Sequence, residues 1–267
     1  MYSLPETAEA EARWWQGLVR HLRAEGVADI PERLTWPEDA IAHWRAPDLL
    51  LSQTCGYPLT HDLAGAVRYV ATPHYAAAGC VGPDYCSRVV VRTGEADRPL
   101  AGFEGRRLAY NGLGSQSGVH ALHALLAGAT ELRDDPFFAE AMACGAHRAA
   151  LAAVRAGRAD LCAVDAVTFA LLQRHAPAEL EGLATIAWTP TAPGLPFVTA
   201  ATASPGRVEA LRRALAAAIE DPALDDVRRT LSIDGISVLP SEAYERILVM
   251  ERDAVARMPA GLFNPRH

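Results

Sequence analysis

The chain has 267 residues, of which 50% are hydrophobic and 21% charged, and its formal net charge is -7 at pH 7. These values are typical of a globular protein with one large domain or two smaller ones, and they argue against a broad basic surface for nucleic acid or anionic lipid. No apolar stretch reaches the roughly 18 residues that a membrane-spanning helix needs. The sequence therefore predicts no membrane insertion.

The first part of the chain predicts one amphipathic helix and three short strands. Residues 6–25 carry apolar side chains at helical spacing and are followed by Gly26, a common helix stop. The segment from Gln53 to Pro58 is polar and small, so it should end the first strand and face a cleft. The predicted strands are residues 48–52, 67–72 and 88–92.

From residue 108 to residue 175 the pattern alternates between strands and helices. The predicted strands are residues 108–110, 141–144 and 161–164, and the predicted helices are residues 119–126, 148–156 and 167–175. Such alternation favours an α/β fold with a mostly parallel sheet covered by helices. After it, residues 185–188 and 197–201 are predicted strands, and residues 208–220, 224–231 and 241–254 are predicted helices. The proline-rich residues 189–196 are interpreted as a crossing between two lobes.

The run from Asn111 to Gly118 joins a predicted strand to the helix that follows it. A newly started helix has about four unpaired N–H groups and the positive end of its dipole, and Ser115 and Ser117 add hydroxyl donors. This pattern predicts a site for a small oxyanion, with a glycine-rich connector capped by Ser117 as the alternative. The glycine spacing is one residue too long for a dinucleotide fingerprint, and no lysine follows Gly118 as in a Walker loop.

Histidines and cysteines give weaker signals. His120 and His123 lie three residues apart on one predicted helix, and without a third clustered ligand we interpret them as surface residues and predict no metal and no cofactor. The five cysteines show no paired C-x-x-C spacing, so neither a disulfide framework nor a zinc site is indicated. Whether Cys55 and Cys80 pair stays open.

Several short motifs, taken together and in this order, carry a resemblance to a known family. They are Gln53-Thr54-Cys55-Gly56, Ala71-Thr72-Pro73 with Tyr75, Gly79-Cys80-Val81-Gly82, Ser115-Gln116-Ser117-Gly118, Gly145-Ala146-His147 and Ala163-Val164-Asp165. The chain resembles the phosphate/phosphonate-binding branch of the periplasmic solute-binding proteins over roughly residues 48–200.

This resemblance implies a two-lobed periplasmic-binding-protein type II fold, in which two crossing strands join the lobes and the ligand is clamped as they close. Lobe one would comprise residues 1–91 and 192–267, and lobe two residues 92–191. The resemblance also implies the ligand-binding residues, which would be Ser115, Gln116, Ser117, Gly118, His147 and Asp165 from lobe two and Thr54, Tyr57 and Tyr75 from lobe one.

Each of these residues also has a simpler structural interpretation. His147 could cap its own helix instead of donating to an oxyanion, and Asp165 could be a helix N-cap instead of a partner for a ligand amine or a protonated phosphate hydroxyl. Thr54, Tyr57 and Tyr75 could pack at strand and loop ends. The segment after Gly145 also lacks the hydroxyl donors that the family pattern carries, which allows a ligand other than phosphonate.

The resemblance favours a solute-binding protein that clamps a small phosphate- or phosphonate-like anion without chemical turnover, in transport or in sensing. The expected partners are this ligand and an ABC transporter permease. The alternative is a cytoplasmic enzyme on the same scaffold, resembling menaquinone-pathway enzymes, with His147 and Asp165 as acid and base. As written, the sequence shows no signal peptide and predicts a cytoplasmic protein, whereas a mis-assigned start or a trimmed chain would fit a periplasmic one.

Overall fold

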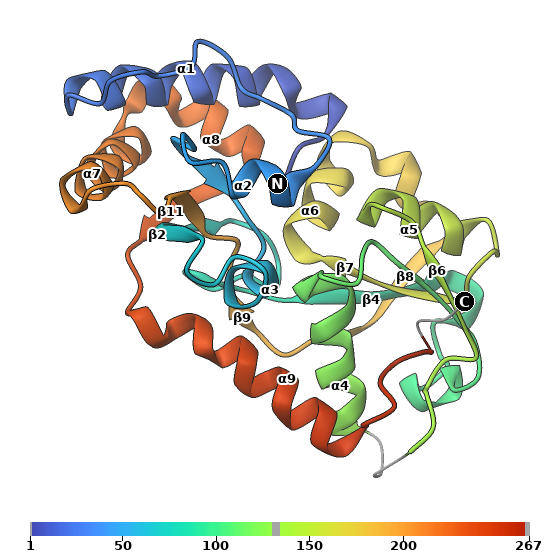
Figure 1. Cartoon of the computed structure of the whole chain (residues 1–267). Coiled ribbons are helices and arrows are strands. Elements are labelled where there is room, and N and C mark those ends of the chain that lie inside the picture. Colours follow the sequence, from blue (N-terminus) through green and yellow to red (C-terminus); the bar gives the residue numbers. More distant parts are fainter. Residues whose placement is uncertain (1, 130–133, 265–267) are drawn as a thin grey trace. The chain divides into compact units, whose positions relative to one another are not determined.

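The computed structural model describes residues 2–129 and 134–264 (Figure 1). The described residues form two compact units, each built from separate stretches of the chain. The described residues of unit 1 belong to the stretches Met1–Ala76, Cys80–Asp84 and Pro193–Ala243. Those of unit 2 belong to Ala77–Gly79, Tyr85–Ala192 and Tyr244–His267. Two short strands, β3 (Asp84–Tyr85) and β9 (Ala192–Pro193), pair where the chain passes from one unit to the other.

Unit 1 contains a four-stranded sheet in the order β1-β10-β2-β11, and every neighbouring pair is antiparallel. The strands are β1 (Ser52–Gln53), β2 (Val67–Tyr75), β10 (Phe197–Ala200) and β11 (Ile233–Ser237). β1 is shorter than the predicted strand over residues 48–52, because its ladder with β10 begins only at Ser52. β11 was not predicted, since Asp234 and Gly235 are poor strand formers in its centre.

Helices cover this sheet and supply the core of unit 1. α1 (Ala8–Ala24) packs along α7 (Pro205–Glu220) and α8 (Asp225–Leu231), as Figure 1 shows. Leu22, Leu211 and Leu215 are fully buried in the apolar cluster between them. The structure confirms the predicted helix near the N-terminus. The short helices α2 (Ala40–Trp44) and α3 (Gly56–Thr60) were not predicted, because five residues are too few to show a helical period.

Unit 2 contains a five-stranded sheet in the order β6-β5-β7-β4-β8. The strands are β4 (Ser87–Arg92), β5 (Arg107–Tyr110), β6 (Glu140–Ala143), β7 (Leu161–Asp165) and β8 (Leu183–Trp188). β5 runs parallel to β6 and β7, whereas β4 is antiparallel to β7 and β8. The sheet is therefore mixed and not mostly parallel as predicted, because β4 and β8 lie outside the alternating strand–helix stretch.

Among its described residues unit 2 has four longer helices, and short helical turns lie between the elements of both units. The helices are α4 (Ala121–Ala129), α5 (His147–Arg155), α6 (Ala166–His175) and α9 (Glu245–Arg257). The turns are η1 (Pro5–Thr7), η2 (Thr93–Glu95), η3 (Leu100–Phe103), η4 (Gln116–His120), η5 (Pro177–Leu180), η6 (Pro222–Leu224) and η7 (Ser241–Tyr244).

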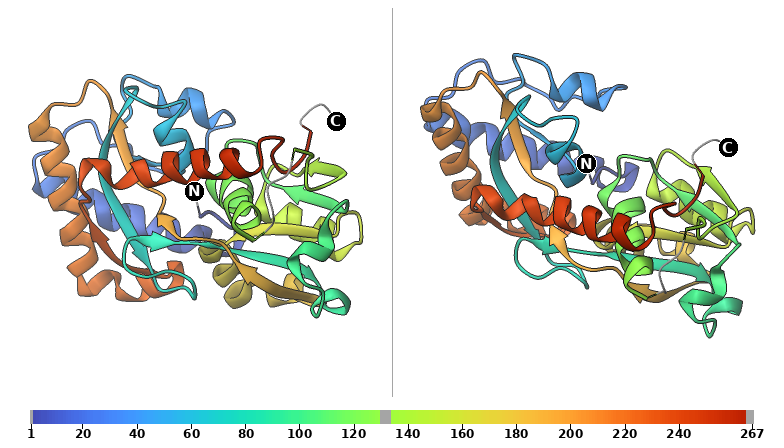
Figure 2. Two further views of the ribbon diagram at one scale, coloured as in Figure 1. Left: turned by 90° about the horizontal axis from the view of Figure 1, so that it is seen from below. Right: turned by 60° about the horizontal axis from the view of Figure 1, so that its bottom comes forward.

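The C-terminal helix α9 lies beside α4 (Figure 2). Met258, at its end, is fully buried in the unit 2 core, and its carbonyl lies 3.1 Å from Nε2 of His123. The interpretation of His123 as a surface residue is therefore wrong, because α9 covers it. Residues 244–264 pack within unit 2, whereas lobe one was expected to include them. Ala254 and Met258 join the apolar cluster that contains Leu122 and Leu126 of α4.

Met258→Ala tests the contribution of α9 to unit 2. Deleting a fully buried methionine side chain leaves a cavity, and we expect the free energy of unfolding to fall by about 2–5 kcal/mol. Urea unfolding followed by circular dichroism measures the change. Val255→Ala on the same helix is the control, because Val255 is 46% exposed and should change stability by less than about 0.5 kcal/mol. Equal effects of the two substitutions would contradict this packing.

Candidate anion-binding site

Three helix starts gather at one edge of the unit 2 sheet. β5, β6 and β7 run parallel, and each is followed by a helix whose first residues come directly after the strand or after a short loop. The carboxyl ends of parallel strands meet at one edge, so the helix N-termini that follow them meet there as well. The sequence-predicted residues of unit 2 all lie at these three starts.

The helix after β5 begins with a π-helical turn, η4, before it continues as α4. Ser115 is the N-cap residue, and its Oγ accepts a hydrogen bond from the Gly118 N–H at 3.0 Å. Ser115, Gln116 and Ser117 are all buried. A π-helical turn widens the helix locally and is frequent at functional sites.

A hydrogen bond links this helix start to the next one. Ser117 Oγ lies 2.9 Å from Nε2 of His147, the first residue of α5, and Ser115 Oγ lies 3.4 Å from Ser117 Oγ. Nδ2 of Asn111, just after β5, is 3.4 Å from the same His147 nitrogen. The sequence-predicted Ser115, Ser117, Gly118 and His147 therefore form one network, which Asn111 joins.

His147 is neutral near pH 7 in this network. The residue is half-buried but its Nδ1 is fully buried, and desolvation lowers the pKa to about 4, while the Ala163 backbone acts in the opposite direction. With Asn111 Nδ2 as a donor, Nε2 is the acceptor nitrogen, so the Ser117 hydroxyl donates to it. A negative charge placed beside this ring would favour its protonation.

Gln116 and Gly118 serve different purposes in this turn. The Gln116 side chain points toward α9, where its Nε2 lies 3.3 Å from Sδ of Met250, so only its backbone N–H is available at the helix start. A Cβ added to Gly118 would lie 1.9 Å from Oδ1 of Asn111, which is buried without a hydrogen-bond partner among the described residues. Gly118 is needed because Asn111 packs directly against its Cα.

Asp165 caps the third helix start. Its Oδ1 accepts hydrogen bonds from the N–H groups of Val167 at 2.8 Å and Thr168 at 3.2 Å, and the residue is buried at 2% exposure. The N-cap interpretation therefore accounts for one carboxylate oxygen of Asp165. A role toward a ligand stays a prediction.

The predicted residues of unit 1 lie just after β1, in α3 and at the end of β2. Thr54 is fully buried and its N–H donates to the Pro196 carbonyl at 3.0 Å. Tyr57, in α3, stacks on His61 with ring centroids 3.8 Å apart. Tyr75 ends β2, and its hydroxyl accepts a hydrogen bond from Gln53 Nε2 at 3.0 Å.

Two polar residues in these networks were not predicted as site residues. Asn111 was part of the glycine-rich run, and its place directly after the strand residue Tyr110 is the signal that identifies it. Gln53 was part of a strand break and of one family motif, without a predicted role as a site residue. Its hydrogen bond to Tyr75 joins residues 22 positions apart, which no local pattern predicts.

The described residues contain no group of three or more His, Cys, Asp or Glu side chains placed to hold a metal ion. Among the described residues, the five cysteines, including Cys55 and Cys80, form no disulfide. Among the described helices, none has the length and apolar character to cross a membrane.

Gly118→Ala tests the packing of Asn111 in the network. The added methyl group must displace the Asn111 amide, so we expect the loss of its contact with His147 and a destabilisation on the order of 1–3 kcal/mol. Urea unfolding and the NMR signal of the His147 ring report these two effects. Gly114→Ala is the matched control, since its Cβ would meet nothing within 4 Å. An unchanged His147 signal in Gly118→Ala would refute the arrangement.

The lowered pKa of His147 predicts a pH dependence of stability. The pKa is about 4 in the folded protein and near 6.5 for an unperturbed histidine, so the unfolded chain takes up the proton first as pH falls. This histidine therefore destabilises the fold progressively between about pH 6.5 and 4. We expect thermal unfolding of His147→Gln to shift less than that of the unsubstituted protein over this range, whereas the control His175→Gln should follow the unsubstituted protein.

Comparison with known proteins identifies the family of this chain. The model of a family described as "ABC transporter, phosphonate, periplasmic substrate-binding protein" matches residues 45–244. No curated protein matches the sequence.

Three solved structures are similar to the chain. XAC2383 from Xanthomonas citri bound to ATP is 18% identical, with a TM-score of 0.68 over 94% of this chain and 93% of that chain. A binding protein component of an ABC phosphonate transporter (PA3383) from Pseudomonas aeruginosa is 16% identical, with a TM-score of 0.72 over 92% and 83%. PhnD1 from Prochlorococcus marinus in complex with methylphosphonate is 16% identical, with a TM-score of 0.69 over 89% of each chain.

These structures share the two-lobed periplasmic-binding-protein type II fold that the sequence motifs predicted, and at this level of identity they establish the fold alone. The family model covers well over half of the chain. The protein therefore belongs to the family of periplasmic substrate-binding proteins of phosphonate ABC transporters, and it is a solute-binding protein.

Proposed function

We propose that the start of η4 and α4, together with His147, binds the oxyanion group of a small phosphate- or phosphonate-like solute. The observation that carries this proposal is the 2.9 Å contact between Ser117 Oγ and His147 Nε2, which brings a hydroxyl and an imidazole together at two adjacent helix starts. Both helix starts direct the positive end of a dipole to the same place. The site thus combines hydroxyl, imidazole and backbone donors.

Backbone donors support this assignment. Within the described part of the chain, the N–H groups of Gln116 and Ser117 donate to no protein acceptor, while the N–H of Gly118 donates to Ser115 Oγ. Gln116 is fully buried and Ser117 is 4% exposed. Buried N–H groups are normally paired, so an oxyanion with several acceptor oxygens suits this turn.

Binding of the anion should be coupled to protonation of His147. The ring is neutral in the structure because burial lowers its pKa to about 4, and it then offers no charge to the ligand. A bound anion favours the imidazolium form, in which Nε2 becomes a donor. A ligand with two negative charges would gain more from this proton than one with a single charge.

The family membership suggests the remaining parts of the function. Thr54, Tyr57 and Tyr75 would complete the site from the first lobe, and Asp165 would contact a polar substituent of the solute. In this proposal the loaded protein delivers its solute to an ABC transporter permease or reports it as a sensor. A location in the periplasm would fit delivery to a permease.

Isothermal titration with methylphosphonate, inorganic phosphate, ATP, methanesulfonate and acetate tests the proposal. We expect one of the phosphorus-containing anions to bind, and to raise stability by about 2.7 kcal/mol at 100 times its dissociation constant. Its affinity should increase as pH falls from 8 to 6, because the complex takes up a proton at His147. Binding enthalpies measured in two buffers of different ionisation enthalpy would show the uptake of that proton.

Ser117→Asp should reduce this affinity at least about 100-fold, because it places a carboxylate where the anion is proposed to lie. Ser204→Asp is the matched control. Ser204 is the N-cap of α7 and accepts from the Arg207 N–H at 3.1 Å, a role that aspartate also fills. The proposal fails if no anion of the panel binds, or if Ser117→Asp binds as tightly as the unsubstituted protein.

A further inference from the structure

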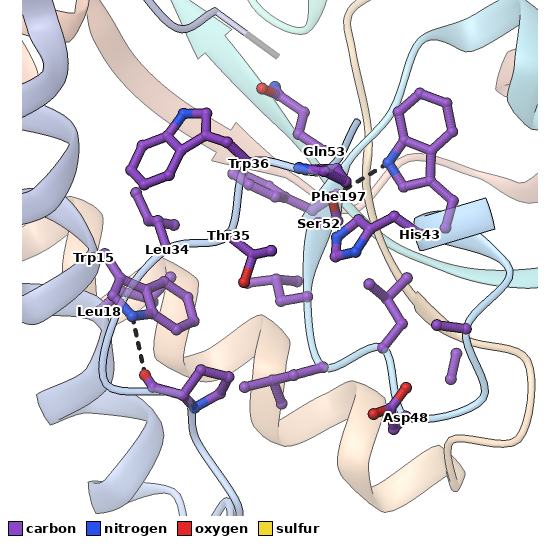
Figure 3. Close-up of a pocket in the computed structure, with 18 of the residues that line it drawn as sticks. Trp15, Leu18, Leu34, Thr35, Trp36, His43, Asp48, Ser52, Gln53 and Phe197 are labelled. Carbon is purple, nitrogen blue, oxygen red and sulfur yellow. Dashed lines mark hydrogen bonds between the residues drawn. The ribbon is translucent and has the colours of Figure 1, made fainter. Parts of the chain in front are cut away.

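Trp188 lies in a different environment from the other tryptophans of the chain. Four of the five tryptophans, namely Trp14, Trp15, Trp36 and Trp44, line a cavity of about 1040 Å³ in unit 1, part of which Figure 3 shows. Trp188 instead ends β8 in unit 2, and 41% of it is exposed. Tryptophan is enriched at binding interfaces, because one part of its ring packs while another stays accessible.

The backbone of Gly79 fixes the position of the Trp188 ring. A Cβ at residue 79 would lie 2.4 Å from Cζ3 of Trp188 and 2.7 Å from Sγ of Cys86, so only glycine fits there. The φ angle of Gly79 is +94°, in the region that favours glycine. Cys86 Sγ donates a hydrogen bond to the Gly79 carbonyl at 3.2 Å. The ring therefore packs against backbone that is itself held in place.

The guanidinium of Arg88 packs on the Trp188 ring and on a second ring. Arg88 is opposite Trp188 in the ladder between β4 and β8, and its Cζ lies 4.4 Å from the Trp188 ring centroid. The same Cζ lies 4.3 Å from the ring centroid of Phe169, a buried residue of α6. The two rings make no ring contact with each other, so they flank the guanidinium from different sides. They hold its position through cation–π contacts.

The charge of Arg88 is unpaired among the described residues. Its Nε is buried without a hydrogen-bond partner, and the two Nη atoms, which form no hydrogen bond or ion pair either, keep access to solvent. Burial lowers the pKa of the guanidinium, the Cys86 thiol acts in the opposite direction, and arginine stays protonated at neutral pH. Charges that lose contact with water are normally paired. Two donor atoms are therefore left for an anion that the described residues do not supply.

We propose that Arg88, held between Phe169 and Trp188, binds a carboxylate group through its two Nη atoms. With a ring on either side, the guanidinium is open to a ligand only in its own plane. Two parallel N–H···O bonds from the Nη atoms match the two oxygens of a carboxylate. The edges of aromatic rings carry partial positive charge, which favours an anion beside them. A tetrahedral phosphate fits less well, because some of its oxygens lie outside this plane.

The carboxylate site shares no residue with the proposed oxyanion site of Ser117 and His147, so it does not depend on the proposed function. Two sources supply such a group, a small carboxylic acid or an aspartate or glutamate side chain of a partner protein. A free acid uses the two Nη donors alone, whereas a docked protein also covers Trp188, and tryptophan and arginine often dominate the binding energy of interfaces. The second source therefore predicts that an acidic peptide binds more tightly than acetate.

Titration of the 267-residue chain with acetate, at an ionic strength held constant with sodium chloride, tests the site. The NMR signals of the Arg88 guanidinium and the Trp188 indole N–H report binding, and Trp188→Phe assigns the indole signal. We expect both signals to shift saturably, with a dissociation constant of about 10 mM or lower. Phosphate should bind there at least about 10-fold more weakly than acetate, because it matches the planar donors less well.

The blocked tripeptide Leu-Glu-Leu, compared with Leu-Gln-Leu, identifies the source of the carboxylate. If the glutamate peptide binds at least about 10-fold more tightly than acetate, the ligand is a side chain of a partner protein. A smaller difference assigns the site to a small acid. The glutamine peptide should not shift the Trp188 signal, since it has no carboxylate.

Two substitutions at residue 88 separate the paired donors from the charge. Arg88→Met keeps an unbranched side chain between the rings and should abolish acetate binding, whereas Arg88→Lys keeps the charge and should weaken binding at least about 10-fold. Arg106→Met is the matched control, because Arg106 is exposed and lies outside this cluster. Circular dichroism confirms that each variant is folded.

Three results would overturn the proposal. The first is that neither acetate nor the glutamate peptide shifts the Trp188 signal. The second is that phosphate or the glutamine peptide binds as tightly as its carboxylate counterpart. The third is that Arg88→Lys binds acetate as tightly as the unsubstituted protein, since a point charge would then be sufficient.

Discussion

The parallel pairing of β5 with β6 and β7 is the constraint on which the rest of unit 2 depends. It places the carboxyl ends of three strands at one sheet edge, and the chain continues from each of them into a helix. Tyr110 is opposite Ala143 in this register, so the loops that follow both strands begin side by side. Ser117 and His147 can meet at 2.9 Å although 30 residues separate them in sequence, because this pairing aligns their helices.

Much of this arrangement could be predicted from local sequence. The segment from Ser115 to Gly118 is recognisable because small residues, hydroxyl side chains and glycine all suit anion binding at a helix start. The helices from α4 to α6 are recognisable because their apolar residues recur at helical spacing. The order of the motifs also predicted the fold class. These signals are short in range, and each depends on residues within about ten positions of one another.

The features that were not predicted depend on contacts distant in sequence. The burial of His123 requires Met258, which is 135 residues away, and the environment of Gln116 requires Met250, which is 134 residues away. The mixed direction of the unit 2 sheet has the same origin, since β4 and β8 join it from outside the alternating stretch. For Asp165, the sequence allowed a cap or a ligand contact, and the structure shows a cap made by Oδ1.

The way in which the chain divides between the two units has a consequence for the order of folding during synthesis. Unit 1 needs Pro193–Ala243 to complete its sheet with β10 and β11, and the core of unit 2 includes Ala254, Met258, Leu262 and Phe263. On a ribosome, residues 1–192 would therefore emerge with both cores incomplete. Unit 1 can close once Ala243 has emerged, and unit 2 only once Phe263 has followed. The growing chain therefore carries exposed apolar surface from both units until these segments are available.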